Sequence, residues 1–299
     1  MYKALLEALP PEIIKQNEPM KMHTSFRIGG PVDIMVIPEN MEQIKTVLRF
    51  CEAANIPLFV VGLGSNLLVR DKGIRGVVLK IGKGLKKVEI NGNRIKTQAG
   101  IRLAELSKIA AAHSLSRFEF AEGIPGSLGG AIFMNAGAYG GEMKDVIISV
   151  DAITKEGEER TFSATELNFS YRNSIFQQNS YIILAAELKL STENQEKIYT
   201  RMKQLATSRR QKQPLHLPSA GSVFRRPEGY YVGPMVEQLG FKGFRIGGAE
   251  VSDKHAGFIV NAADATADDV LAMIKKIQHE VKQQYSVDLR SEIRVIGEE

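Results

Sequence analysis

The stretch that most constrains the fold of this chain is GIPGSLGGAIFMNAGAYGG, residues 123–141, which is nearly free of side-chain volume. Seven of its nineteen residues are glycine, and four others are alanine or serine. Glycine inside a regular element costs about 0.5–1 kcal/mol relative to alanine, so core packing alone does not favour such a run. The stretch therefore predicts a backbone that lies within van der Waals reach of a large flat ligand.

A second glycine turn, VVGLGSNLLV at residues 60–69, comes directly after a predicted strand. It is not a dinucleotide fingerprint of the Rossmann type, because Leu67 occupies the third glycine position and a strand-like LLV follows where a helix is required. A tight strand–turn–strand can still present N–H groups to a diphosphate. A plain glycine turn explains this pattern equally well, but together with residues 123–141 it suits a dinucleotide held between two glycine-rich loops.

The rest of the chain alternates predicted hairpins with predicted helices. The periodicity of the apolar residues predicts helices at 42–54, 102–113, 193–212 and from Thr266 onwards. Thr266 can cap the last of these helices with Asp269 at the third helical position, and its predicted buried face consists of Val270, Ile274, Ile277 and Val281. It predicts strands at 34–38, 58–62, 77–81, 85–90, 94–100 and 181–190. Turns are expected at Asn91-Gly92 and at Glu156-Gly157. This mixture indicates an α+β fold rather than a doubly wound parallel sheet.

The closing segment VDLRSEIRV is expected to be one strand, because its apolar and charged residues alternate. The predicted apolar face consists of Val287, Leu289, Ile293 and Val295. The predicted charged face consists of Asp288, Arg290, Glu292 and Arg294, which taken alone is a solvated surface.

Composition and motif searches exclude several classes of protein. The net charge is +5, but the basic residues are scattered and tryptophan is absent, which favours a site for an anionic small molecule over nucleic-acid binding. The single cysteine, Cys51, rules out an intrachain disulfide and reads as a buried helix residue. No HExxH motif occurs and the five histidines are scattered, so no metal site is expected. The N-terminus has no signal-peptide pattern and no stretch is long and apolar enough to span a membrane, so a cytoplasmic protein is expected.

Three further residues are candidates for chemistry, although each has an ordinary structural explanation. Ser222 lies in PSAGSVFRRP, where a serine normally caps or turns the chain. Arg172 lies in NFSYRNSIF, where a lone arginine is commonly a surface ion-pair partner. Glu292 lies on the charged face of the closing segment.

Seven motifs occur in the order GLGSN, GIPGSLGGAIFMNAGAYG, YRNSIF, SAGSVFRRP, FKGFRIGGAEV, HAGFIVNA and SEIRVIG. From about residue 20 to the C-terminus the chain thereby resembles the UDP-N-acetylenolpyruvoylglucosamine reductase family. The resemblance implies an FAD-binding portion of the vanillyl-alcohol-oxidase type, with subdomains at 1–80 and 81–195, and a substrate-binding domain at 196–299. It also implies non-covalent FAD, NADPH as co-substrate and UDP-N-acetylglucosamine enolpyruvate as substrate. The expected protein makes UDP-N-acetylmuramate for peptidoglycan synthesis. It is expected to act as a monomer, to need no metal ion, and to bind neither nucleic acid nor a membrane.

The resemblance also assigns roles to residues of this chain. It implies that Arg172 stabilises negative charge on the substrate carboxylate, that Glu292 assists as an acid or by hydrogen bonding, and that Ser222 protonates the adjacent carbon. Substrate binding is assigned to Tyr171, Lys212 and Arg226. FAD binding is assigned to Gly62, Leu63, Gly64, Ser65, Asn66, Gly123, Ile124, Pro125, Gly126, Ser127, Gly129, Gly130, Asn135 and Gly137.

One departure places the chain in a shorter branch of this family. Only eight residues separate Arg172 from Tyr181, so the inserted loop whose tyrosine closes over the substrate in longer members is absent. Tyr230 or Tyr231 is then a candidate for covering the sugar nucleotide, and a surface role fits either tyrosine equally well.

Three alternatives remain open. The first is a flavoprotein alcohol or lactone oxidase of the same fold, although neither glycine loop contains the His or Cys that often anchors flavin covalently. The second is a nucleotide-binding module without catalysis, and the third is an RNA-binding protein.

Overall fold

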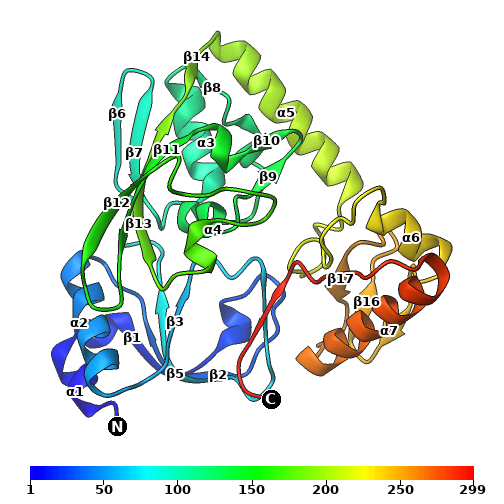
Figure 1. Cartoon of the computed structure of the whole chain (residues 1–299), viewed down its shortest axis with the longest axis horizontal. Coiled ribbons are helices and arrows are strands. Elements are labelled where there is room, and N and C mark those ends of the chain that lie inside the picture. The colour runs from blue at the N-terminus through cyan, green and yellow to red at the C-terminus, as the bar shows by residue number, and fades with distance from the viewer. The chain divides into compact units, whose positions relative to one another are not determined.

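The computed structural model describes residues 1–299 and divides the chain into two compact units. The first unit contains residues 1–16, 34–63 and 76–209, and the second contains residues 17–33, 64–75 and 210–299. Figure 1 shows the helices and strands of both units, most of them labelled. The predicted boundaries at residues 80 and 195 separate domains by the ligand that each is expected to bind, whereas the two units are defined by contacts within the chain. These domain boundaries therefore stay a prediction.

A four-stranded sheet of order β1-β2-β5-β3 begins the first unit, and the boundary between the units falls within β1, β2 and β5. Its strands are β1 (Ile14–Pro19), β2 (Pro31–Val36), β3 (Leu58–Val61) and β5 (Ile74–Lys80). Helix α1 (Lys3–Ala8) precedes this sheet, and α2 (Met41–Ala53) connects β2 to β3. Strand β5 lies between β2 and β3 and runs parallel to β3, with Val77 opposite Leu58. The predicted strand–helix–strand order is thus present, with a third strand inserted in the sheet.

A five-stranded antiparallel sheet of order β12-β11-β13-β7-β6 also belongs to the first unit. Its strands are β6 (Val88–Asn91), β7 (Arg94–Gln98), β11 (Ile147–Ile153), β12 (Glu159–Ser163) and β13 (Ile182–Lys189). Both predicted hairpins form, and Gly92 and Gly157 have the positive φ angles of +57° and +90° that glycine tolerates best. The first turn lies one residue later than predicted, at 92–93, because Asn91 already pairs with Arg94.

Shorter elements and three helices complete the first unit. They are α3 (Leu103–Ala112), β8 (Leu115–Ser116), α4 (Leu128–Phe133), β9 (Gly137–Ala138), β10 (Gly141–Glu142), β14 (Ser191–Thr192) and α5 (Gln195–Lys212). The last three residues of α5 belong to the second unit. One hydrophobic cluster joins side chains of both sheets with those of α2, α3 and α4. Cys51 lies in this cluster as predicted, and burial raises the pKa of its thiol to about 11.

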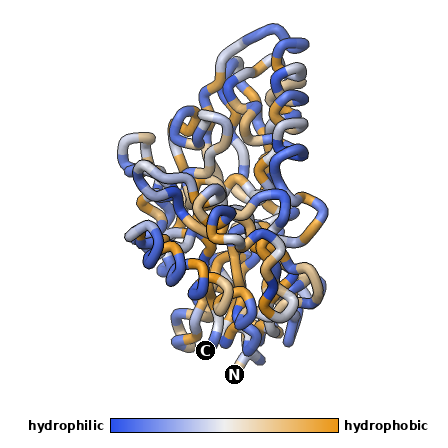
Figure 2. Tube along the Cα trace, turned by 90° about the vertical axis from the view of Figure 1, so that its right-hand side faces the viewer, coloured by the Kyte–Doolittle hydropathy of each residue, from blue (hydrophilic) through white to orange (hydrophobic).

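Helix α5 differs from the other long helices in its polarity. Only Ile198 and Met202 are buried along its eighteen residues. Figure 2 shows the same property, since hydrophilic colours predominate along the helix near the top of the view. A helix with so few buried apolar residues depends on polar contacts for its position.

The second unit contains two small sheets and two helices. Its elements are β4 (Leu67–Val69), α6 (Val232–Gln238), β15 (Arg245–Ile246), β16 (Ala249–Val251), β17 (Ile259–Asn261), α7 (Ala267–Tyr285) and β18 (Arg294–Ile296). Strands β15, β16 and β17 pair antiparallel, and β18 pairs with β4 in parallel. Thr266 and Asp269 form a reciprocal capping box at the start of α7, as the sequence predicts. The predicted apolar face of α7 is buried, from Val270 to Val281.

The prediction of one closing strand is wrong in part. Only Arg294–Ile296 form a strand, and the preceding residues contact their neighbours through isolated bridges such as Phe224 with Ser291. Leu289 and Ile293 are buried as expected, but Val295 is 36% exposed. The expected alternation of buried and exposed side chains does not continue to Val295. The residues before Arg294 do not form a regular strand, so the two-residue period is not kept along the whole segment.

No helix of the structure combines the length and the apolar composition needed to cross a bilayer.

Candidate functional site

Within the first unit, Gly62 of the first glycine loop lies close to the glycine-rich stretch of residues 123–141. Gly62 directly follows β3, and a Cβ added to it would lie 2.4 Å from Oγ of Ser127. Ser127 is 2% exposed and precedes α4, whose first turn is fixed by a 2.9 Å hydrogen bond from the Leu128 N–H to the Ile101 carbonyl. A side chain at position 62 therefore fits only if the Ser127 hydroxyl or the backbone shifts.

Several glycines of residues 123–141 are likewise required by neighbouring protein atoms. An added Cβ would lie 2.9 Å from Cδ of Arg209 at Gly123, 3.0 Å from Cβ of Ala99 at Gly129, and 2.6 Å from Cγ of Glu142 at Gly137. Gly130 is different, since its nearest neighbour is Oγ of Ser127 at 3.5 Å. The low side-chain volume of this stretch therefore serves packing as well as the open surface that the sequence suggested.

Asn135 is a fully buried hydrogen-bonding centre inside the glycine-rich stretch. Its Nδ2 donates to Oε2 of Glu142 and to the carbonyl of Ser170, both at 3.0 Å, and its Oδ1 accepts from the Lys144 N–H at 3.0 Å. Its φ of +40° is in the left-handed region, which asparagine tolerates better than most residues. Asn135 thereby joins the glycine-rich stretch to the segment that carries Arg172.

Arg172 lies beside the end of the glycine-rich stretch. Its Nη2 donates to the Gly137 carbonyl at 3.4 Å, and its guanidinium lies 5.2 Å from the centre of the Tyr171 ring. Its own carbonyl accepts from Nε2 of Gln177 at 2.9 Å, which fixes a backbone with φ of +54°. The pKa of Glu142 is lowered, chiefly by its hydrogen bond with Lys144 and in smaller part by the charge of Arg172. Glu142 is a residue that the sequence analysis missed, because nothing local marks it.

In the second unit the structure brings Ser222, Glu292 and Asn66 into one region. The Glu292 N–H donates to the carbonyl of Val223, the residue after Ser222, at 2.7 Å. Nδ2 of Asn66 donates to the Glu292 carbonyl at 3.1 Å, and the Asn66 carbonyl accepts from the Arg294 N–H at 3.0 Å. Three predicted site residues from distant parts of the sequence therefore meet in this unit.

The predicted substrate-binding residues of the second unit are exposed. Arg226 stacks over the ring of Tyr231 at 3.8 Å, and its Nε donates to the Tyr230 carbonyl at 3.3 Å. Tyr231 is 61% exposed, so one face of this cation–aromatic pair is accessible to a ligand. Lys212 is also exposed, at the last residue of α5.

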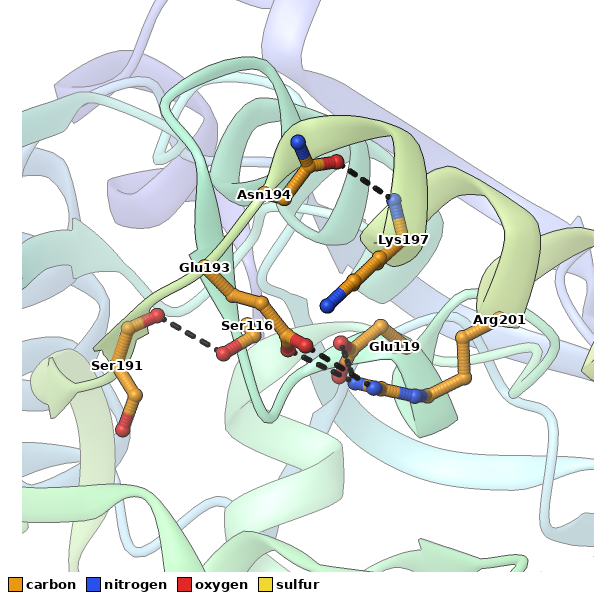
Figure 3. A network of polar contacts seen from close by, with 7 residues as sticks. All are labelled: Ser116, Glu119, Ser191, Glu193, Asn194, Lys197 and Arg201. Atoms are coloured by element: carbon orange, nitrogen blue, oxygen red, sulfur yellow. Dashed lines mark hydrogen bonds and ion pairs between the residues drawn. The ribbon is translucent and has the colours of Figure 1, made fainter.

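The beginning of α5 is held to the first unit by the polar network of Figure 3. Arg201 donates from Nη1 to Oε1 of Glu119 at 2.6 Å and contacts Glu193 at 3.3 Å. The Glu119 carboxylate is 5% exposed, while the arginine is 46% exposed. Glu119 stands four residues before Gly123, so the ion pair connects α5 to the chain that leads into the glycine-rich stretch.

Arg209 follows on α5, about 12 Å further along the helix at 1.5 Å per residue. Its side chain lies against the Cα of Gly123, and its guanidinium forms no ion pair. Burial lowers its pKa, and the nearby Tyr139 partly opposes this effect. A partly desolvated cation without a carboxylate partner is unfavourable unless an anion binds to it. Nothing in the local sequence distinguishes this residue from the other scattered basic residues.

No three His, Cys, Asp or Glu side chains come together in residues 1–299 in a way that would hold a metal ion.

Comparison with known protein families defines the class of protein to which the chain belongs. Residues 32–163 match an FAD-binding domain family, and this range includes both glycine-rich loops. Residues 213–296 match the C-terminal domain of UDP-N-acetylenolpyruvoylglucosamine reductase, a range that includes Ser222 and Glu292. The chain is therefore an FAD-dependent oxidoreductase.

The family follows from full-length relatives. The UDP-N-acetylenolpyruvoylglucosamine reductase of Syntrophomonas wolfei is 56% identical over 299 residues, and that of Alkaliphilus oremlandii is 51% identical over 298. These alignments cover 100% of this chain and 100% and 98% of the two relatives. The crystal structure of the Thermus caldophilus reductase superimposes with a TM-score of 0.82 at 32% identity, over 94% of this chain and 98% of that one. The chain belongs to the UDP-N-acetylenolpyruvoylglucosamine reductase family.

These findings confirm the predicted family, the α+β FAD-binding fold and FAD as the cofactor. The roles assigned to individual site residues stay predictions.

Proposed function

We propose that this chain reduces UDP-N-acetylglucosamine enolpyruvate to UDP-N-acetylmuramate with NADPH, through bound FAD, in the synthesis of bacterial peptidoglycan precursors. The observation that carries this proposal is the 56% identity to a reductase of that name over the whole length of both chains. The matches of residues 32–163 to an FAD-binding domain and of residues 213–296 to the reductase C-terminal domain also support it.

The first unit fits FAD in two respects. Residues 123–126 and Gly130 are at least partly exposed and offer mostly main chain, whereas the neighbouring Ser127 and Leu128 are buried. Arg209 adds a cation without an ion-pair partner next to Gly123, which suits the negative charges of a dinucleotide. In this unit we assign Gly62, Leu63 and the predicted residues of 123–137 to FAD binding, and we add Arg209. Gly64, Ser65 and Asn66 belong to the second unit, and for them FAD binding stays a prediction. FAD held by the residues of the first unit would supply hydride transfer between NADPH and the methylene carbon of the enolpyruvyl group.

Arg172 would stabilise the negative charge that develops on the substrate carboxylate during reduction. Its backbone is fixed by Gln177 and its guanidinium is oriented by the Gly137 carbonyl. A cation that is oriented before the reaction stabilises developing charge without the cost of reorganising solvent. Tyr171, which lies beside this guanidinium and is 48% exposed, would help to bind the substrate.

Ser222 would donate a proton to the carbon next to the carboxylate. A serine hydroxyl is a weak acid in water, but a strongly basic enolate can remove its proton when the two are in hydrogen-bond reach. Glu292 would assist from the neighbouring segment, since the hydrogen bond from its N–H to the Val223 carbonyl keeps the two segments together. Lys212 and Arg226 would pair with the diphosphate of the sugar nucleotide.

We further propose that residues 1–80 and 81–195 act as the two FAD-binding subdomains and residues 196–299 as the substrate-binding domain. The C-terminal domain match at 213–296 supports the last of these ranges. We propose a monomer that works in the cytoplasm, where NADPH and nucleotide sugars are available.

The proposal is tested by an anaerobic absorption spectrum recorded in three steps: as isolated, after NADPH, and after UDP-N-acetylglucosamine enolpyruvate. The flavin band is expected to bleach with NADPH and to return with the enolpyruvyl substrate. A band that bleaches but ignores this substrate would refute the proposed acceptor, and a protein that retains no flavin after addition of FAD would refute the cofactor.

The same spectra test Ser222 with an internal control. In Ser222→Ala the reduction of flavin by NADPH is expected to stay near the wild-type rate. Its reoxidation by the enolpyruvyl substrate is expected to slow by about 10²–10⁴-fold, the usual contribution of a general acid. Equal slowing of both half-reactions would mean that the serine is structural.

A further inference from the structure

The segment that carries Ser222 is held by a tight turn at residues 252–258 in the second unit. Ser222 forms an isolated antiparallel bridge with Phe258, and the Val223 N–H donates to the Gly257 carbonyl at 3.0 Å. The turn closes on itself, because the Phe258 N–H donates to the His255 carbonyl at 3.0 Å. The position of Ser222 thus depends on the conformation of this turn.

His255 fixes the turn with its side chain. Nδ1 of the ring accepts from the Gly257 N–H at 3.0 Å. Such an acceptor is a ring nitrogen without a proton, so the bond requires the neutral imidazole with its proton on Nε2. The ring also packs edge-on against Phe258, with 5.0 Å between the centroids.

Gly257 lies between the imidazole and the hydroxyl of Ser222. A Cβ added to Gly257 would lie 3.0 Å from Cε1 of His255 and 3.7 Å from Oγ of Ser222. The N–H that His255 holds and the carbonyl that accepts from the Val223 N–H therefore belong to the same residue, Gly257. A shift of Gly257 would move the segment that carries Ser222 with it.

The surroundings of the ring favour its neutral form, mainly because the ring is buried. Burial is the main factor that lowers the pKa of His255, and Lys242 lowers it further, while its own backbone hydrogen bond and Glu237 oppose the shift. Lys242 and Glu237 pair with each other at 2.6 Å, and Glu237 lies on α6, whose Gly233 also packs against the ring. Within the turn itself, Asp253 and Lys254 are exposed.

We propose that His255 is a positioning residue for Ser222: its unprotonated Nδ1 holds the N–H of Gly257, and the carbonyl of this glycine holds the adjoining Val223, so that the serine lies where it can deliver its proton. The inference rests on the proposed role of Ser222. Protonation of His255 removes the acceptor, so the second half-reaction should weaken as the pH falls through the depressed pKa of the ring. Reduction of flavin by NADPH does not use the serine and should not show this loss.

Two substitutions separate this role from a purely structural one. In His255→Asn, Oδ1 takes the place of Nδ1 and can still accept from Gly257, but it does not titrate. In His255→Gln, the carbonyl oxygen lies nearer the place of Nε2 and the acceptor at Nδ1 is lost. The two variants remove the same ring, so they differ mainly in this one hydrogen bond.

Both half-reactions should be measured by anaerobic stopped-flow from pH 5 to pH 8. In His255→Asn the rate of the second half-reaction is expected to stay within about threefold of wild type at pH 8. Because asparagine does not titrate, this rate should fall less at low pH than it does in the wild type. His255→Gln is expected to slow it by about tenfold or more at all pH values, because a displacement of 1 Å can cost about 10²-fold. Equal rates in the two variants, or an unchanged acid decline in His255→Asn, would overturn the proposal. So would slowing of the first half-reaction to the same extent.

Ser222→Ala is measured beside these variants, because it distinguishes an error in the proposed role of Ser222 from an error in the role of His255. If this variant keeps a normal second half-reaction, the proposed role of Ser222 is wrong and the inference falls with it. If it is slow while the two His255 variants behave alike, only the role of His255 is wrong.

Discussion

The close approach of Gly62 to Ser127 gives a prediction whose size follows from the structure. An added Cβ would lie 2.4 Å from Oγ of Ser127, about 1 Å inside the optimal separation of roughly 3.5 Å. Gly62 does not have a positive φ, so Gly62→Ala introduces this clash without backbone strain. Rotating a buried serine away from its preferred torsion costs about 0.5–1.5 kcal/mol, and moving the backbone instead costs about 1–3 kcal/mol.

Gly62→Ala is therefore expected to weaken FAD binding by about 1–3 kcal/mol, or roughly 5- to 150-fold in Kd, because both loops are assigned to the cofactor. Removing the hydroxyl should restore binding in Gly62→Ala/Ser127→Ala, since the next atom, Cβ of Ser127, lies 3.6 Å away, in ordinary contact. The Kd of each variant can be measured by quenching of flavin fluorescence when FAD is added to the apoprotein. The double-mutant cycle isolates the coupling between the two positions.

Gly82→Ala is the matched control, because a Cβ on Gly82 meets no atom within 4 Å and its φ is not positive. It should bind FAD like wild type. The reasoning is refuted if Gly62→Ala binds FAD normally, or if Ser127→Ala fails to improve the binding of Gly62→Ala.

Three further outcomes are expected. Arg209→Gln should raise the Kd for FAD by about tenfold or more, with Arg209→Lys in between, as measured by the same titration; an unchanged Kd would remove Arg209 from the cofactor site. Arg201→Met should lower the free energy of unfolding by about 1–3 kcal/mol in urea denaturation, because it leaves the buried Glu119 carboxylate without its partner, whereas a change below 0.5 kcal/mol would contradict the anchoring role of this pair. At the start of α7, Thr266→Ala should cost about 1 kcal/mol at pH 7. Hydrogen bonds from Thr266 and Gly248 lower the pKa of Asp269. Its contribution to folding stability should therefore be present when the pH is above the ordinary carboxyl pKa, and it should be lost as the pH falls through the lowered pKa. Asp269→Asn should remove that part of the decrease of Tm at acid pH.

The elements that could be predicted from the sequence are those whose signal is local. The hairpin at Gly157 follows from residues inside the turn, and the start of α7 follows from Thr266 and Asp269 within one helical turn. The closing segment could not be predicted in the same way. Its alternation of apolar and charged residues is real, but the pairing of β18 with the short β4 depends on residues far away in the sequence, and regular strand geometry is limited to three residues.

The candidate site shows the same limit at the level of single residues. The motifs located Ser222, Glu292 and Arg172, because each stands in a distinctive local pattern. Arg209 and His255 were not located, because what distinguishes them is tertiary. One lies unpaired against Gly123, and the other accepts a hydrogen bond from a peptide that supports Ser222.

The glycine-rich stretch illustrates why a correct conclusion can rest on an incomplete reason. The lack of side chains in residues 123–141 predicts room for a ligand, and the match to an FAD-binding family agrees with a ligand at these residues. The structure shows that Gly129 and Gly137 make room for Ala99 and Glu142 instead. Small residues in a sequence report that something approaches the backbone closely, but they do not report whether it is protein or ligand. Substitutions at these two glycines should therefore disturb packing first and FAD binding only as a consequence, whereas a substitution at Gly130, whose nearest neighbour is 3.5 Å away, should act on the cofactor directly.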